Sequence, residues 1–229
     1  MRVFPRFVVI PLAFACAFLL PRSVAAEEPQ PPPSTKASAI GFHPYAAIDG
    51  NTMAASSSFE AVLGTATLLG YGGGVDVTDV WKHLFARVAV THATKKGTRA
   101  IFTGTEAVPL GIPLTVSMTP LEFGGGWRFV PSRGRIVPYA GAAALVLSYK
   151  ETSPVPPADA SDNVSDSFTG YEVFGGAEFG LTKWLVAAGE AQYRGVPNAI
   201  GDAGLSQAFS ETDLGGFTVR FTIGLRTNR

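Results

Sequence analysis

The sequence predicts an all-β protein that folds as a single up-and-down antiparallel β-barrel of about eight strands. Apolar and polar residues alternate with period two in most segments after residue 41, which is typical of strands with one apolar face. The connections between these segments alternate between short turns and long loops, which favours a meander with an even number of strands. No apolar pattern of helical period competes with this interpretation.

The last strand, at 217–226, has the strictest pattern. Its apolar positions are Phe217, Val219, Phe221, Ile223 and Leu225. The same alternation predicts strands at 185–194, 171–181, 137–150, 121–129, 84–91, 71–78 and, with the weakest pattern, 44–50. In 137–150 we expect the large residues, such as Tyr139 and Leu145, on the apolar face. Short turns are expected at 79–82, 131–135 and 182–183, and long loops at 51–69, 92–118, 151–169 and 196–214.

The first 26 residues have the three parts of a cleaved secretory signal peptide. Arg2 and Arg6 precede an apolar run at 8–20, and Val24-Ala25-Ala26 supplies a cleavage site. A retained membrane helix is the alternative, but the run is shorter than the roughly 20 residues that spanning requires. A lipid-modified Cys16 is a second alternative, although Ala13 stands where leucine is usual. We expect a proline-rich periplasmic leader at 27–40 and the barrel at 41–229.

The composition after the signal peptide excludes several function classes. Three of the 18 basic side chains, at Arg2, Arg6 and Arg22, leave with the signal, while all 18 acidic ones remain. This slightly acidic balance gives no support for a nucleic-acid partner. The only cysteine leaves as well, so no disulfide or thiolate site is expected. No later apolar run is long enough for a membrane helix, so a membrane-bound form requires a barrel.

Two arrangements fit the alternation: a soluble lipocalin-like barrel with its apolar face inside, and a transmembrane barrel with that face outside. The polar face is also the small one, with Gly72, Gly74, Gly124, Gly126, Ala140, Ala142, Ala144 and Gly176. Small residues suit the narrow interior of eight strands. Aromatic residues at both ends of the apolar face predict two membrane girdles: Trp127, Phe129, Tyr139, Tyr149, Tyr171, Trp184, Tyr193 and Phe217. Leu145 is then expected to face hydrocarbon near the bilayer midplane, and the transmembrane barrel is favoured.

The chain resembles the OmpA-type small outer-membrane β-barrel domain proteins of Gram-negative bacteria. The resemblance covers about residues 40–226 and rests on the signal peptide, the motif Pro138-Tyr139-Ala140-Gly141-Ala142 and the closing strand 217–225. It implies an outer-membrane, porin-like protein of the cell envelope that the barrel-assembly machinery inserts. That machinery usually recognises a terminal aromatic residue, from which the ending Leu225 to Arg229 departs. The peptidoglycan-binding domain that often follows such a barrel, and the anchoring role it confers, are not implied here.

Ten charged residues have the parity of the barrel interior: Asp76, Arg87, Glu122, Arg128, Glu172, Glu178, Glu190, Arg194, Arg220 and Arg226. We expect them to form a salt-bridged plug, and the alternative is a narrow ion path. If the turn at 182–183 centres on Lys183, Glu172 lies opposite Arg194 and Glu190 can reach Arg220.

No catalytic, cofactor or metal site is predicted. His43, His83 and His92 lack a serine and an acid at strand-defined distances, so we do not expect an enzyme. Lys95, Lys96 and Arg99 fall in a predicted loop, where they either contact phosphates of outer-membrane lipid, including lipopolysaccharide, or are simply solvated.

The expected function is therefore a monomeric, non-enzymatic barrel acting in envelope structure or in surface interaction through its long loops. A narrow pore or carrier for ions or small amphipathic molecules is the alternative, and a lipid-modifying enzyme ranks third.

Overall fold

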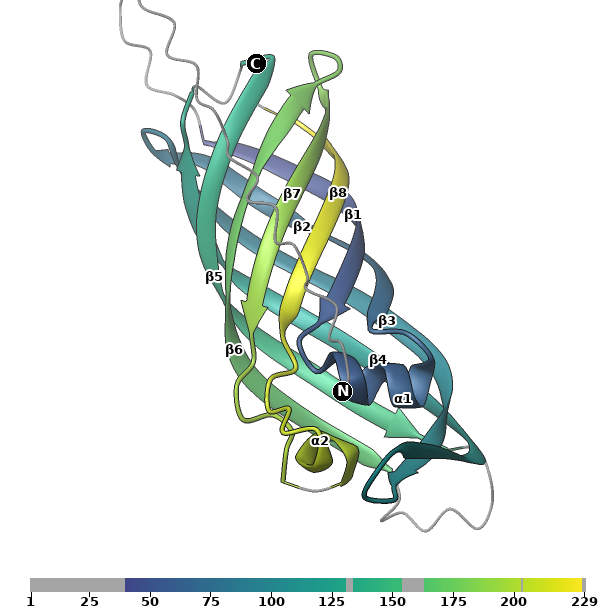
Figure 1. The fold of residues 1–229 in the computed structure, drawn as a ribbon. Coiled ribbons are helices and arrows are strands. Elements are labelled where there is room, and N and C mark those ends of the chain that lie inside the picture. Colours follow the sequence, from purple (N-terminus) through teal and green to yellow (C-terminus); the bar gives the residue numbers. More distant parts are fainter. Residues whose placement is uncertain (1–39, 131–133, 154–162, 203, 228–229) are drawn as a thin grey trace, which may run out of the picture. The chain divides into compact units, whose positions relative to one another are not determined.

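The computed structural model describes residues 40–130, 134–153, 163–202 and 204–227, which form a closed antiparallel β-barrel (Figure 1). Its strands are β1 (Gly41–Met53), β2 (Thr67–Trp81), β3 (Leu84–Phe102), β4 (Ala107–Arg128), β5 (Ile136–Thr152), β6 (Val164–Gly180), β7 (Leu185–Gly195) and β8 (Gly216–Leu225). Each strand pairs with the next along the chain, and β8 closes the barrel against β1. The predicted eight-stranded up-and-down fold is confirmed. The predicted signal peptide and leader lie outside the described residues.

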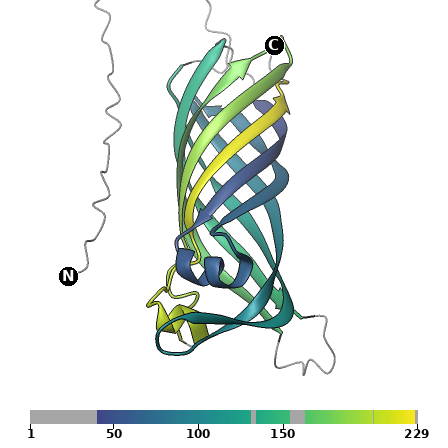
Figure 2. The same cartoon turned by 45° about the vertical axis from the view of Figure 1, so that its right-hand side comes forward.

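The two ends of the barrel differ, as the alternating connections predict. At one end, called the inner end below, short turns join β2 to β3 and β6 to β7, and β8 also ends there (the upper end in Figure 1). At the outer end lie the longer connections, which contain helix α1 (Ser56–Leu63) and the short helix α2 (Gly204–Ala208) (Figures 1 and 2). In the described part of the chain, neither helix has the length or apolarity needed to cross a membrane. Outer-membrane barrels have this polarity, with short turns toward the periplasm.

The predicted inward and outward faces are confirmed for β2, β3, β4, β6, β7 and β8. Large apolar side chains project from the outer wall, among them Tyr71, Val88, Phe123, Val173, Tyr193 and Phe221. Along the middle of the described strands, outward positions carry no Asp, Glu, Lys or Arg. An apolar outer wall around a charged interior is the surface of a membrane-spanning barrel, whereas a soluble barrel would reverse it.

Strand β5 has the opposite orientation to the predicted one. Tyr139, Leu145 and Tyr149 are buried inside the barrel, together with Val137, Ala143 and Leu147. The small residues Ala140, Ala142 and Ala144 face outward instead. Two girdle assignments, Tyr139 and Tyr149, are therefore wrong, as is the expectation that Leu145 faces hydrocarbon. The other six girdle aromatics, Trp127, Phe129, Tyr171, Trp184, Tyr193 and Phe217, are exposed on the outer wall.

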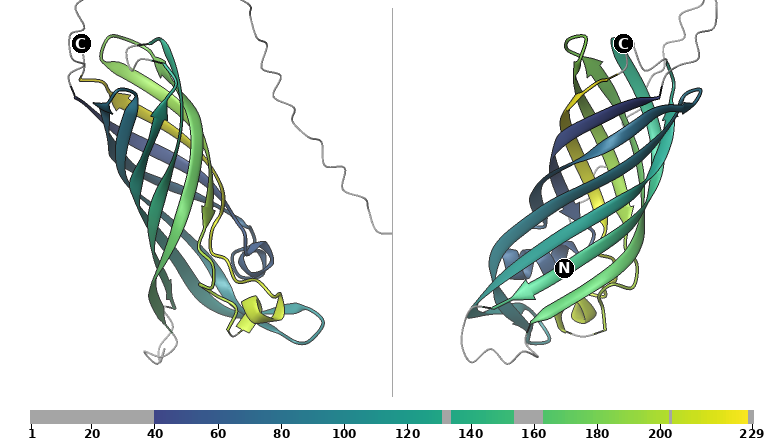
Figure 3. Two further views of the ribbon diagram at one scale, coloured as in Figure 1. Left: turned by 90° about the vertical axis from the view of Figure 1, so that its left-hand side faces the viewer. Right: turned by 180° about the vertical axis from the view of Figure 1, so that it is seen from behind.

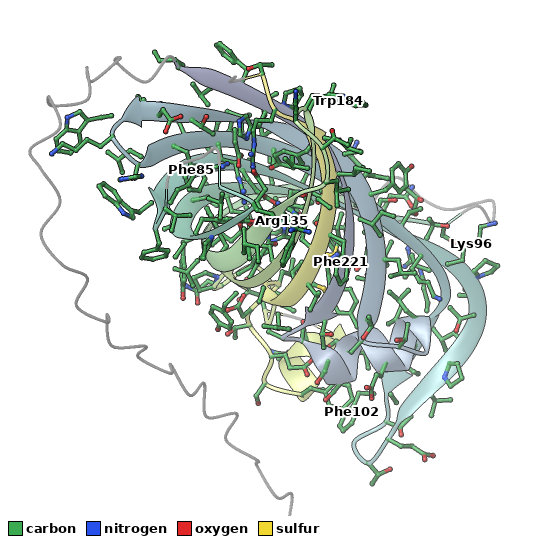
Figure 4. All side chains as sticks on the ribbon, turned by 90° about the horizontal axis from the view of Figure 1, so that it is seen from above. Phe85, Lys96, Phe102, Arg135, Trp184 and Phe221 are labelled. Atoms are coloured by element: carbon green, nitrogen blue, oxygen red, sulfur yellow. The ribbon has the colours of Figure 1, made fainter. Side chains whose placement is uncertain are left out.

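Pairing across the sheet explains this orientation. Directly opposed residues in an antiparallel pair point to the same side, and Val137 lies opposite Glu178 while Leu145 lies opposite Glu122. Both glutamates are buried in the interior. Tyr139 packs edge-on against Phe85, with ring centroids 5.9 Å apart. Figure 4, seen from the side of the inner end, labels Phe85, which is buried inside the barrel, and Trp184, which is exposed outside it.

The outer half of the interior is an apolar core. Leu68, Met118, Leu145 and Leu147 belong to one buried cluster with residues of α1 such as Phe59. The glycine at position 97 permits this packing, because a Cβ there would lie 2.1 Å from the carbonyl oxygen of Val62 in α1. Helix α1 therefore lies close against β3 across the outer mouth.

The region 92–118 is not a loop. β3 and β4 continue as a paired hairpin to Phe102 and Ala107 (Figure 3). The ring of Phe102 packs on Phe209 near α2, with centroids 5.5 Å apart. Strands outside the hydrocarbon layer do not need an apolar face toward lipid. This part of the hairpin therefore lacks the strict alternation of apolar and polar residues from which a strand could be predicted. Lys95, Lys96 and Arg99 accordingly lie on β3 rather than in a loop.

Candidate functional site: the charged network inside the barrel

Among the described residues, six acidic side chains and five arginines are buried in the barrel interior. The ten predicted interior charges all lie there, and Asp49 of β1 adds the sixth acid: Asp49, Asp76, Arg87, Glu122, Arg128, Glu172, Glu178, Glu190, Arg194, Arg220 and Arg226. Asp49 is not among the predicted interior charges. Its signal is available in the sequence, because Asp49 is the only Asp, Glu, Lys or Arg in the predicted strand 44–50 and directly follows the apolar Ile48.

Arg220 of β8 is the centre of the part nearest the apolar core. It donates to both carboxylate oxygens of Asp49, at 2.8 and 2.9 Å, and to both of Glu122, at 2.8 and 2.7 Å. Arg194 of β7 joins the same group, donating to Glu122 and to Glu172, each at 2.7 Å. Two-oxygen contacts with a planar guanidinium are among the stronger hydrogen bonds in proteins, and they fix the side-chain geometry.

Arg87 of β3 holds the middle of the network. It donates to both oxygens of Asp76, at 2.8 and 3.1 Å, and to Glu190, at 2.7 and 2.9 Å. Its guanidinium also lies 4.5 Å from the ring centroid of Phe174, within a cluster that includes Tyr139. A cation over aromatic rings in a desolvated site gains further stabilisation. The guanidinium also lies 5.7 Å from the ring centroid of Tyr139, and this second contact requires the inward orientation of β5.

Glu178 of β6 holds the inner end. Its carboxylate accepts hydrogen bonds from Arg128, at 3.2 Å, and from Arg226. His43 of β1 lies 3.5 Å from the same carboxylate. The sequence analysis placed His43 before the first strand, whereas β1 begins at Gly41 and buries this ring in the lumen.

The three parts form one continuous chain of charge contacts along the barrel. Arg128 lies 3.7 Å from Asp76, which connects the inner and middle parts. Arg220 lies 4.0 Å from Glu190, which connects the middle part to the group around Glu122. Because the five arginines nearly balance the six acids, the buried charge is largely compensated within the lumen. This arrangement links strands on opposite sides of the barrel through paired charges that occupy the lumen.

The predicted register of β6 and β7 is confirmed. Glu172 lies directly opposite Arg194, and Gly176 lies opposite Glu190. The Glu172–Arg194 ion pair forms inside the barrel, with Nε and Oε2 2.7 Å apart. Glu190 is opposite Arg220 on β8, also as expected.

The remaining candidate residues are spread over the barrel. His92 is on the outward face, where Nδ1 lies 2.9 Å from the hydroxyl oxygen of Thr119 and the ring contacts Tyr71. His83 is in the turn after β2 and packs on Trp127. Lys96 lies outside the wall in Figure 4, whereas Arg99 lines a hollow at the outer mouth. Within the described ranges, no cluster of metal-ligating side chains is found.

At the outer mouth, Glu211 caps α1 from another part of the chain. The backbone N–H groups of Ser57 and Ser58 donate to its two carboxylate oxygens, each at 2.9 Å. Partial burial raises the pKa of Glu211, but the hydrogen bonds from Ser58 and Ser57 outweigh it and hold the pKa below its ordinary value. The segment between β7 and β8 is thereby tied to α1.

We expect Glu211→Gln to loosen the first turn of α1. Because the pKa is lowered in the folded protein, the ionised carboxylate stabilises this contact above the ordinary glutamate pKa of about 4.3 and ceases to do so as pH falls through the lower folded value. Amide exchange at Ser57 and Ser58, measured by NMR at neutral pH, should become faster in the variant. Glu60→Gln, at an exposed position of the same helix, is the matched control. Equal exchange in wild type and Glu211→Gln would contradict the cap.

Comparison with known proteins finds no matching family model and no matching curated protein. Solved structures do match. A major outer membrane protein of Thermus thermophilus is 14% identical, with a TM-score of 0.52, over 82% of this chain and 99% of that one. The fold is that of a small outer-membrane β-barrel.

Two further solved outer-membrane barrels are similar to this chain in fold. Ail of Yersinia pestis, solved in complex with the heparin analogue sucrose octasulfate, is 11% identical, with a TM-score of 0.51 over 82% of this chain and 98% of Ail. OprG of Pseudomonas aeruginosa is 12% identical, with a TM-score of 0.51 over 84% and 98%. This shared fold fits the OmpA-type resemblance, and with the apolar outer wall it indicates a barrel of the outer membrane.

Proposed function

We propose that this chain is a non-enzymatic, monomeric outer-membrane barrel that is closed to ions and acts in envelope structure or surface interaction through its outer end. The observation that carries the proposal is the continuous network from Glu178 to Glu172, capped by the apolar core beneath α1. Eight strands leave an interior that side chains can fill, and here charged and apolar side chains occupy it in succession.

The outer end supports a role in surface interaction. The β3–β4 hairpin, α1 and the segment around α2 gather there, and the hairpin carries exposed apolar residues such as Phe102 and Ile112. Lys96 faces outward on the same hairpin, as contact with phosphates of outer-leaflet lipid requires. Lys95 is paired with Val116, which is buried. Because paired residues point to the same side of the sheet, the position of Lys95 belongs to the inner face of the wall and not to the lipid-facing one.

The purified protein, reconstituted in planar lipid bilayers, is expected to show no stable unitary conductance. An ion entering the lumen would have to displace paired charges that are buried and hydrogen-bonded, which costs several kcal/mol per broken pair. A conducting porin in the same bilayers is the positive control. Large, long-lived openings of the wild-type barrel would contradict the seal and favour the narrow pore.

One observation favours the second candidate, binding or carriage of a small amphipathic molecule. A hollow of about 340 Å³ opens at the outer mouth, and most of its walls are apolar. The third candidate, a lipid-modifying enzyme, would need an acid to orient a histidine base. In the described structure His92 contacts Thr119 and Tyr71, neither of which is acidic. His43 does lie beside the acid Glu178, but its ring is buried in the lumen among the paired charges and away from the outer wall that would meet lipid.

A further inference from the structure

The hollow at the outer mouth is enclosed by elements from four parts of the chain. Helix α1, the β3–β4 hairpin, the end of β5 and the segment around α2 all contribute to its walls. The apolar residues that line it include Phe59, Leu63, Leu114, Val116, Ile200 and Leu205. Its volume of about 340 Å³ is at the lower end of the range, about 300–1,000 Å³, that is usual for small-molecule sites.

The hollow is closed below. Met118, Leu145 and Leu147 belong to the buried apolar core under it, and the charged network follows. The space recorded between that core and Arg194 is only about 30 Å³, which suits a water molecule rather than a ligand. A molecule in the outer hollow therefore enters and leaves from the outer side.

The polar groups of the hollow define what kind of head group fits. Tyr149, buried in the wall, donates its hydroxyl to the carboxylate of Glu151, and an ionised carboxylate retains further acceptor sites beyond one such bond. Arg99 also lines the hollow, and its positive charge is opposite in sign to that of the Glu151 carboxylate. Since the two charges balance, a ligand with net charge would lose its hydration without gaining a net counter-charge. An uncharged hydrogen-bond donor avoids that penalty.

We propose that this hollow binds a small uncharged amphiphile, with its hydrocarbon part against α1 and β4 and a hydroxyl or amide head donating to Glu151. The proposal goes beyond the sealed barrel, because the seal concerns ions crossing the lumen and the hollow concerns one molecule held at the outer mouth. Conductance measurements test the first and ligand binding tests the second, so the two fail independently.

Isoleucine methyl groups provide the test. In the full barrel reconstituted in phosphatidylcholine nanodiscs, hexanol should shift the methyl NMR signals of Ile101 and Ile200, which line the hollow, along a saturating curve. Ile48 and Ile223, on the lipid-facing wall, report hexanol dissolved in the bilayer and should show no saturation over the same range. Hexanoate and hexylammonium, which carry a net charge, should each bind at least about tenfold more weakly than hexanol.

Variants separate the site from nonspecific partitioning. Leu205→Trp fills the hollow from α2 and should abolish the saturating shifts, whereas Gln207→Trp, on an exposed position of the same helix, should leave them unchanged. Glu151→Leu should weaken hexanol binding about tenfold, while Glu151→Gln, which retains an acceptor oxygen, should weaken it less. Equal, unsaturable shifts at all four isoleucines would overturn the binding site. Tighter binding of hexanoate than of hexanol would overturn the uncharged head group.

Discussion

Replacing Arg220 with leucine should lower the free energy of unfolding by about 3–5 kcal/mol. Arg220 is completely buried and makes two-oxygen contacts with both Asp49 and Glu122. Without it, Asp49 keeps only a contact of 3.6 Å with Arg194 among its recorded charge partners in the described structure. The cost comes from leaving a carboxylate buried with too little positive charge nearby. Urea unfolding in phospholipid vesicles, followed by tryptophan fluorescence, measures it.

Two further variants sharpen this test. Arg135→Leu removes an exposed arginine at the inner end and should change stability by less than about 0.5 kcal/mol. The double variant Asp49→Leu with Arg220→Leu removes both partners, so its loss should be smaller than the sum of the two single losses. If Arg220→Leu costs under about 1 kcal/mol, water screens the network, and the sealed lumen would have to be replaced by a hydrated one.

Replacing Phe221 with arginine should cost roughly 2–4 kcal/mol of stability in a bilayer. Phe221 is the third of five outward apolar residues on β8 and is 65% exposed on the wall. If that wall faces hydrocarbon, its middle position lies near the bilayer midplane, where a charge is most costly. Phe217→Arg, near the outer end of the same face, should cost only about 0–1 kcal/mol.

The comparison of these two variants separates the membrane barrel from a soluble one. On a water-exposed wall, a phenylalanine so exposed could be replaced by arginine with a change within about 0.5 kcal/mol at either position. Equal, small effects at Phe221 and Phe217 would therefore remove the argument for a lipid-facing surface. Folding into vesicles, followed by the difference in gel migration between heated and unheated samples, checks that each variant inserts.

Several features of the barrel follow from the sequence alone, because one strong local signal marks each of them. Some strands carry all their charged residues on one face, as β6 does with Glu172 and Glu178 and β7 with Arg194. That face must point away from lipid. The turn between β6 and β7 is short enough to set the register by counting, which is why Glu172 opposite Arg194 could be predicted.

The orientation of β5 could not be predicted, because both of its faces are apolar. Nothing in 137–147 carries a charge, so only side-chain size distinguishes the two faces, and size alone predicts that the larger residues face lipid. The preceding connection, 129–135, leaves the register uncertain by one residue, and one residue reverses every side chain. The decision came from tertiary contacts: Tyr139 packs on Phe85 beside Arg87, and Leu145 covers the charged network at Glu122.

The sequence by itself determined the strand number, the closed meander, the polarity of the two ends and the interior placement of ten charges, since period-two alternation and turn length are local properties of the chain. Only the tertiary structure decided the inward face of β5, the burial of His43, the continuation of the β3–β4 hairpin and the hollow beneath α1. Each of these depends on which distant side chains meet inside the barrel, and closure of the sheet, rather than any local pattern, brings them together.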